Sequence, residues 1–140
     1  MKEFDVIVIG GGMVGLAFAI ELSQKKNCSI AIVEPNTSNP SINKTFHTRV
    51  SAITPSSEAY LKSLNIWNDI KRKQVFVATK VWDQNSHGRL NFHAKDENMD
   101  HLGYIIENDL IQSALFGGID KHQINFYNAN LSGLNKTNNG

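Results

Sequence analysis

Three glycines near the start of the chain, Gly10, Gly12 and Gly15, have the G-x-G-x-x-G spacing that suits dinucleotide binding. In this arrangement the first glycine permits a tight turn after a strand, the second lets the backbone approach a pyrophosphate, and the third lets a helix pack closely on the strand. The N–H groups and the dipole at the start of that helix favour a phosphate anion. Further along, the Glu34 carboxylate can accept hydrogen bonds from a ribose diol.

The elements that would position these residues can be predicted on either side of them. The apolar run Val6–Ile9 predicts a buried strand, Val14–Lys25 predicts a helix, and Ile30–Val33 predicts a second strand that leads into Glu34. A glycine motif alone is common by chance, and a carboxylate at a strand end is often only solvated. The order strand, helix, strand is that of a Rossmann-like βαβ unit, and it favours the binding interpretation.

Beyond Glu34 the chain departs from a simple alternation of strands and helices. Residues 35–43 predict a long surface loop, and Thr54 followed by Pro55 predicts the start of a second helix. The buried side of this helix, with the apolar residues that continue it, is expected to comprise Ala59, Leu61, Leu64, Ile66, Trp67 and Ile70.

A hairpin is the next expected feature. The alternating segments Val75–Asp83 and Arg89–His93, separated by a turn at residues 85–88, predict two antiparallel strands. Such a hairpin does not belong to a plain nicotinamide-binding Rossmann domain.

The remaining residues predict one more helix between two short strands. The strands are expected at Gly103–Ile106 and Ile124–Tyr127, and the helix between them is expected to be capped by Asn108 and ended by the pair Gly117–Gly118. The polar tail, residues 132–140, is expected to lie on the surface or to lack order.

The composition excludes several classes of protein. Hydrophobic residues make up 41% and charged residues 19% of the chain, which fits a soluble globular domain. A net charge of +1 with scattered basic residues gives no reason to expect a nucleic-acid partner. No apolar run is long enough for a signal peptide or a transmembrane segment, so a cytoplasmic location is expected. The single Cys28 cannot form an internal disulfide, and no metal site is predicted.

Two further segments carry a family resemblance. Residues 48–53 precede the second helix, and residues 103–115 include the dipeptide Glu107–Asn108. Together with the glycine motif, these segments resemble the N-terminal part of the FAD-dependent aromatic hydroxylases, in particular the ubiquinone-biosynthesis monooxygenase family. The implied fold is of the α/β class: a Rossmann-like FAD-binding βαβ domain with an inserted antiparallel hairpin, truncated relative to the family.

The resemblance also implies a set of cofactor-binding residues, and no catalytic residue is assigned. The set is Gly10, Gly11, Gly12, Val14, Gly15, Glu34 and Arg49. Arg49 matches a family arginine that lies near the cofactor, although a single arginine in a polar segment is often only solvated. Neither Glu107 nor Asn108 is assigned a cofactor contact, because Glu107 can be an exposed surface residue and Asn108 can cap the following helix. Each of the five histidines is interpreted as a plain polar residue without an acid–base partner.

The implied activity is the hydroxylation of an aromatic ring. In such enzymes NAD(P)H reduces FAD, and one oxygen atom of O2 is transferred to a substrate, here a polyprenylated phenol or quinone precursor. That substrate implies a protein at the surface of the inner membrane, or in a ubiquinone-biosynthesis complex, without a membrane span.

Family members are longer than this chain. Residues 1–140 are therefore expected to form an N-terminal FAD-binding fragment that is inactive alone, in which residues 75–105 supply strands of an incomplete substrate-binding sheet. Two alternatives stay open: a stand-alone dinucleotide-binding module, and a nonfunctional remnant of a hydroxylase. The ring position hydroxylated, the choice of NADH or NADPH, and the oligomeric state also stay open.

Overall fold

The chain divides into two units, which are described separately. The computed structural model describes residues 2–36, 45–85, 87–122 and 124–136. The first unit contains the described residues of 1–39 and 115–140, and the second contains those of 40–114. Most of the predicted loop, and the last four residues of the predicted tail, lie outside the described residues.

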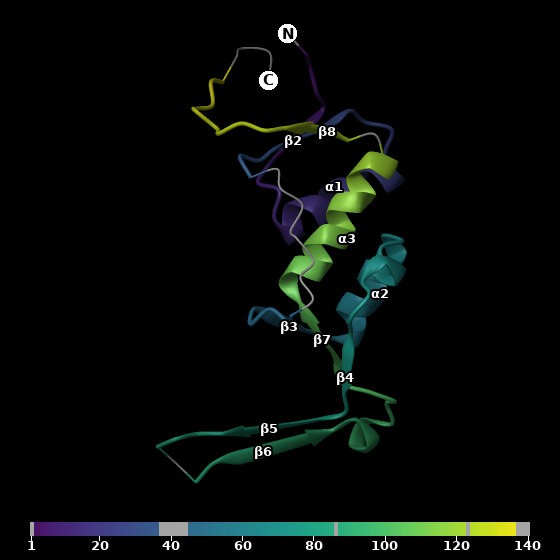
Figure 1. Ribbon diagram of the computed structural model, residues 1–140, viewed down its shortest axis with the longest axis vertical. Helices are drawn as coiled ribbons and strands as arrows, with labels where there is room; N and C mark the ends of the chain where they lie inside the picture. The colour runs from purple at the N-terminus through teal and green to yellow at the C-terminus, as the bar shows by residue number, and fades with distance from the viewer. Residues whose placement is uncertain (1, 37–44, 86, 123, 137–140) are drawn as a thin grey trace. The chain divides into compact units, whose positions relative to one another are not determined.

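The first unit holds a parallel sheet of three strands. These are β1 (Val6–Ile9), β2 (Ile30–Val33) and β8 (Asn125–Tyr127), in the order β1-β2-β8. Strands β2 and β8 are labelled in Figure 1. Helix α1 (Met13–Lys25) connects β1 to β2, so the predicted βαβ unit is present. Its bounds differ from the predicted ones by a single residue at the start of the helix.

The prediction that β1 is buried was wrong: Val6 and Val8 are half-buried, and Ile7 and Ile9 are exposed. Ile7 is 55% exposed and Ile9 is 49% exposed, whereas β2 is almost entirely buried. The reason is that β2 lies between two strands and packs against α1, while β1 is flanked by β2 alone among the described strands. Side chains alternate along a strand, so Val8 faces Gly15 of α1 and its neighbours Ile7 and Ile9 point to the opposite face.

Helix α1 forms because its apolar residues recur at helical spacing. Leu16, Ala19 and Ile20 are fully buried, and they lie three and four positions apart on one face. Lys25 in the last turn interacts favourably with the negative end of the helix dipole and pairs with Glu21. The helix therefore buries one face, while the opposite face exposes the apolar side chains of Val14 and Phe18.

The second unit contains an antiparallel sheet of three strands. These are β3 (Val50–Ile53), β4 (Gln74–Phe76) and β7 (Gly103–Glu107), in the order β3-β7-β4. Strand β7 extends one residue beyond its predicted end. Strand β3 was not predicted, because its four residues include Ser51 and Ala52 and show little of the β-branched alternation that marks a strand.

The hairpin prediction was right in kind but too long in its first strand. The predicted segment Val75–Asp83 is divided at Val77: β4 pairs with β7, and only β5 (Ala78–Trp82) pairs with β6 (Arg89–His93). A short 3-10 helix, η2 (Ala94–Glu97), follows the hairpin. The alternating segment was predicted as one strand, but its first residues belong to β4, which is hydrogen bonded to β7, and most of the rest belong to β5, which is hydrogen bonded to β6.

Helix α2 (Pro55–Ser63) begins as predicted. Thr54 Oγ1 accepts a hydrogen bond from Ser57 N at 3.4 Å, and Pro55 occupies the first turn. The expectation that Ala59 is buried was wrong, because Ala59 is exposed and the neighbouring Glu58 is buried instead. The other expected core residues, in α2, in the 3-10 helix η1 (Trp67–Asp69) and beside them, are buried: Leu61, Leu64, Ile66, Trp67 and Ile70.

Helix α3 (Asn108–Lys121) includes Asn108, the predicted capping residue, as its first residue, and it does not end at the predicted glycine pair. The helix continues because glycine can adopt helical angles at a cost of only about 1 kcal/mol relative to alanine, and because the residue after the pair, Ile119, is buried. In the first unit, the ring of Phe116 lies 5.2 Å from that of Phe126 in β8, which attaches the last turns of α3 to the sheet. The described part of the predicted tail, residues 132–136, is exposed and has no regular structure, as expected.

Candidate functional site

The turn between β1 and α1 depends on two of the predicted glycines. Gly10 has φ +104°, a left-handed conformation that side chains disfavour, and its N–H donates to Val33 O at 2.9 Å. A Cβ on Gly15 would lie 2.2 Å from Gly10 O and 3.2 Å from Val8 Cγ1. The first and third glycines therefore have the structural roles that the motif predicted.

Gly12 leaves open space at the start of α1. It is the N-cap residue, with φ −72° and ψ 175°, and no side chain caps the helix there. A Cβ on Gly12 would meet no described atom within 4 Å, and the first turn contains no acidic residue. The opening helix lines a hollow of about 520 Å³. The lining residues are Val8, Ile9, Gly10, Gly12, Met13, Val14, Gly15 and Phe18. An uncapped helix start beside such a hollow can bind an anion.

The carboxylate of Glu34 lies against the same turn. Its Oε2 accepts a hydrogen bond from Gly11 N at 2.8 Å, and its Oε1 accepts one from Asn36 N at 2.8 Å. The Gly11 amide, and then the Asn36 amide, hold the pKa of Glu34 below its ordinary value, so the group is ionised at neutral pH. A Cβ on Gly11, at a variable position of the motif, would lie 2.8 Å from Glu34 Cγ, so the absence of a side chain here lets Glu34 lie against the turn.

The structure brings six of the seven predicted cofactor residues into one unit. Val14 is 84% exposed and lines the hollow with its glycine neighbours. Arg49 belongs to the second unit, immediately before β3, and its side chain is exposed. Its main chain is hydrogen bonded on both sides: Arg49 N donates to His47 Nδ1 at 3.1 Å, and Arg49 O accepts from Asn108 N at 3.0 Å.

The explanation of Glu107 by exposure was wrong, because its side chain is only 7% exposed. Arg72 Nε donates to Glu107 Oε2 at 3.0 Å, and a second Arg72 nitrogen donates to Oε1 at 3.0 Å. His47 N also donates to Oε1, at 2.8 Å. Burial of a carboxylate requires such partners, and these lie 35 and 60 positions away in the sequence, where no local pattern indicates them.

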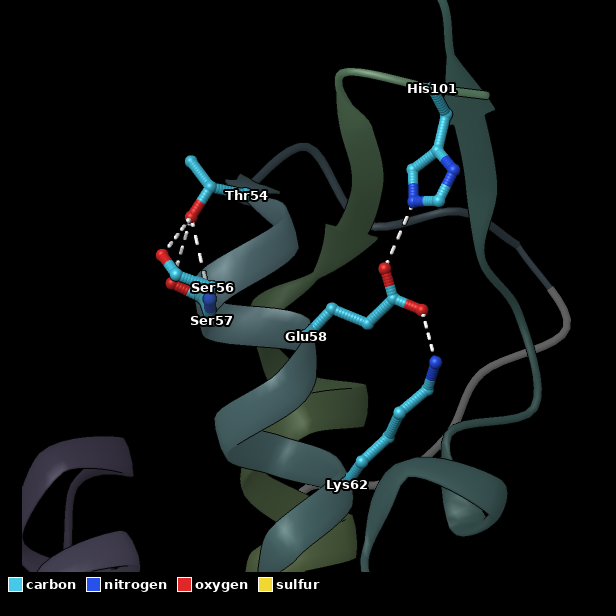
Figure 2. Close-up of polar contacts among 6 residues, drawn as sticks. All are labelled: Thr54, Ser56, Ser57, Glu58, Lys62 and His101. Carbon is cyan, nitrogen blue, oxygen red and sulfur yellow. Dashed lines mark hydrogen bonds and ion pairs between the residues drawn. The ribbon is translucent and has the colours of Figure 1, made fainter. Parts of the chain in front are cut away.

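The interpretation of every histidine as a plain polar residue was wrong for His101. Figure 2 shows the carboxylate of Glu58 between His101 and Lys62, and His101 Nε2 lies 2.9 Å from Glu58 Oε2. The Lys62 ammonium lies 2.6 Å from the other oxygen. Hydrogen bonding to Lys62 does most to lower the pKa of Glu58, and His101 contributes further. These contacts replace water around a carboxylate that α2 turns inward.

Among the described residues, no group of three or more histidines, cysteines and carboxylates could hold a metal ion. Within the same ranges, none of the helices combines the length and the apolar character needed to cross a bilayer.

Several curated proteins are similar to this chain in sequence. The mouse (Mus musculus) ubiquinone biosynthesis monooxygenase COQ6 is 35% identical over 119 residues, which are 80% of this chain and 25% of that protein. The zebrafish (Danio rerio) protein of the same name is 37% identical over 119 residues, covering 80% of this chain and 24% of its own length. The chain resembles the ubiquinone-biosynthesis monooxygenases. The predicted family resemblance is thereby confirmed.

A bacterial relative extends this likeness to ubiquinone-biosynthesis enzymes. The 3-demethoxyubiquinol 3-hydroxylase of Escherichia coli (strain K12) is 28% identical over 121 residues, which are 84% of this chain and 30% of that enzyme. The chain thus spans about a quarter of the length of the first relatives that it matches. No protein-family model matches the chain.

Solved structures share the fold. The p-nitrophenol 4-monooxygenase PnpA from Pseudomonas putida DLL-E4 superposes with a TM-score of 0.66 at 17% identity, covering 94% of this chain and 33% of its own. A flavoprotein/dehydrogenase from Cytophaga hutchinsonii gives a TM-score of 0.66 at 17% identity, covering 95% of this chain and 32% of its own. The predicted α/β fold of the Rossmann-like kind is confirmed.

Proposed function

We propose that the chain binds FAD at the glycine turn and is the cofactor-binding part of a monooxygenase of ubiquinone biosynthesis. The observation that carries this proposal is the uncapped start of α1, which opens at Gly12 on a hollow where no described atom would contact a Cβ. The likeness to two ubiquinone biosynthesis monooxygenases, and the shared fold of a flavoprotein/dehydrogenase, support the choice of flavin chemistry over other dinucleotide chemistry.

The residues present fit the ADP half of FAD. The pyrophosphate is anionic, and the first-turn N–H groups of α1 with the helix dipole favour an anion at Gly12. Glu34 is ionised and acceptor-only, and each of its oxygens retains capacity for a further hydrogen bond from a ribose hydroxyl. The bond from Gly11 N to Glu34 fixes this carboxylate beside the turn before any ligand binds.

Two further assignments belong to the proposal. Arg49 supplies an exposed guanidinium that can contact an anionic part of the cofactor. The strands within residues 75–105 form the beginning of a substrate-binding sheet, and residues 1–140 as a whole form a cofactor-binding fragment.

When bound, FAD supplies the redox and oxygen-transfer chemistry, with NAD(P)H as the reductant and O2 as the source of oxygen. The described residues bind and orient the cofactor, and none of them is assigned a part in proton transfer. The proposed substrate is a phenolic or quinol precursor that carries a polyprenyl tail. Such a tail partitions into lipid, so the proposal includes association with a membrane surface or with other enzymes of ubiquinone biosynthesis.

The test compares FAD binding by the chain and by a Gly12→Ala variant. Gly12 has an ordinary negative φ and open surroundings, so the substitution leaves the fold intact while its methyl group occupies the space that the pyrophosphate needs. We expect FAD, titrated by the quenching of its fluorescence, to bind the unaltered chain and to bind the variant about tenfold more weakly or worse.

Gly117→Ala is the matched control, because Gly117 also has open surroundings but lies in the middle of α3. It should bind FAD as the unaltered chain does. Absence of FAD binding by the unaltered chain, or equal affinity of the Gly12→Ala variant, would overturn the proposal.

A further inference from the structure

The dipeptide Glu107–Asn108, where β7 ends and α3 begins, contacts the segment around Arg49 at three points. Glu107 Oε1 accepts a hydrogen bond from His47 N at 2.8 Å, and Asn108 N donates to Arg49 O at 3.0 Å. Ser51 Oγ donates to Asn108 Oδ1 at 2.6 Å. These bonds reach the chain before, at and after Arg49, so the dipeptide fixes the main chain on both sides of that residue.

The ion pair with Arg72 fixes the orientation of the Glu107 carboxylate. Arg72 donates from Nε and from a second nitrogen to the two carboxylate oxygens, a planar fork that allows one orientation of each group. Arg72 also lies over the ring of Phe46, at 5.3 Å. Buried ion pairs contribute little net stability, because desolvation offsets much of their attraction. A role in fixing geometry accounts better for this pair than a role in stability.

Arg49 itself combines a fixed main chain with a solvent-exposed side chain. The residue donates its N–H to His47 Nδ1 and accepts at its carbonyl from Asn108 N, while its guanidinium has no described ion pair. A long cationic side chain on a fixed main chain loses less freedom when it binds an anion than one on a mobile segment.

We propose that Glu107 and Asn108 are positioning residues that hold Arg49 ready to contact an anionic ligand. With FAD as that ligand, the inference rests on the proposed function and adds a second set of residues that determines cofactor affinity. Glu107 acts through Arg49 and does not itself contact the cofactor.

The experiment measures FAD affinity in a double-mutant cycle of Glu107→Gln and Arg49→Ala in the full chain. A glutamine keeps the shape of Glu107 but presents one acceptor where three donors converge, and its NH2 group faces a donor. We expect Arg49→Ala to weaken FAD binding about tenfold, and Glu107→Gln to weaken it by at least about threefold. In the Arg49→Ala background, Glu107→Gln should have no further effect, because its influence passes through Arg49.

Two further variants separate positioning from general damage to the fold. Glu58→Gln alters another buried, paired carboxylate of the same unit that makes no described contact with residues 46–51, so it should leave FAD affinity unchanged. Ser51→Ala removes only the hydrogen bond to Asn108 Oδ1 and should reduce FAD affinity by a smaller factor than Glu107→Gln. The inference would be overturned if Glu107→Gln weakened FAD binding by the same factor with and without Arg49→Ala. It would also be overturned if Glu58→Gln weakened FAD binding as much as Glu107→Gln does.

Amide hydrogen exchange provides a readout that needs no FAD. Glu107→Gln should speed the exchange of the His47 and Asn108 amides, whereas Glu58→Gln should not. If the unaltered chain binds no FAD, the proposed function fails, and the exchange rates still decide whether Glu107 positions the segment. Unchanged exchange of these amides in Glu107→Gln would refute the positioning role.

Discussion

Replacement of Gly15 by alanine tests the close packing of α1 on β1. The added Cβ would lie 2.2 Å from Gly10 O, where ordinary contacts are at least 3.4 Å, and 3.2 Å from Val8 Cγ1. The first atom belongs to the backbone of a turn with a positive φ, so it cannot move away as a flexible side chain would. The helix or the turn must therefore shift by roughly 1 Å, as expected for an overpacked site.

The magnitude follows from two opposing effects. Overpacking costs about 1 to 3 kcal/mol, and alanine in a helix is favoured over glycine by about 1 kcal/mol. Because the clash is with backbone, we expect a value in the upper part of the overpacking range and a net loss of about 1 to 2 kcal/mol in the free energy of unfolding. For a chain of this size, such a loss lowers the melting temperature by roughly 3 to 8 °C.

The assay is urea-induced unfolding of the chain, followed by circular dichroism. Gly15→Ala should lower the midpoint without changing the slope, because the surface exposed on unfolding stays the same. Gly12→Ala is the matched control: it adds the same methyl group three positions earlier, where no described atom lies within 4 Å. A Gly15→Ala variant as stable as Gly12→Ala would refute the described packing of α1 on β1.

Two further predictions concern α3 and α2. Gly117→Ala should raise the free energy of unfolding by about 0.5 to 1 kcal/mol, because α3 continues through open surroundings at this residue; a loss of stability in urea unfolding would mean that the helix ends there. The lowered pKa of Glu58 means that its ionised form is favoured in the folded state, so its contribution is present above its ordinary pKa of 4.5 and is lost as the pH falls through the folded value. Urea unfolding at a series of pH values should show a steeper loss of stability below about pH 5 in the unaltered chain than in Glu58→Gln, and identical profiles would contradict the pairing with Lys62 and His101.

The βαβ unit was predictable because each of its signals is local. The apolar runs of β1 and β2, the helical spacing of Leu16 and Ile20, and the glycines between them lie within 30 consecutive residues or so. The exposure of Ile7 was not predictable in this way, since it depends on which strands flank β1. A continuous apolar run is typical of a strand buried on both faces, so the sequence pattern did not indicate that Ile7 and Ile9 would be exposed.

Features that depend on partners distant in the chain could not be predicted from the sequence. Glu58 is buried with His101, 43 positions away, against its carboxylate, and Ala59, the next residue of α2, is exposed. Glu107 is buried because Arg72 and His47 supply donors. The glycine pair in α3 shows the reverse case, in which a local stop signal was overridden by the burial of Ile119.

The most direct test of the central claim is a map of the amides that respond to FAD. In a 15N-labelled sample of the chain, titration with FAD should shift the amide signals of Gly10, Gly11, Gly12 and Val14, and that of Glu34 beside them. At the same sub-saturating FAD concentration, these shifts should be much smaller in Gly12→Ala. Shifts confined to other residues, or no shifts at all, would contradict the assignment of the glycine turn as the dinucleotide site.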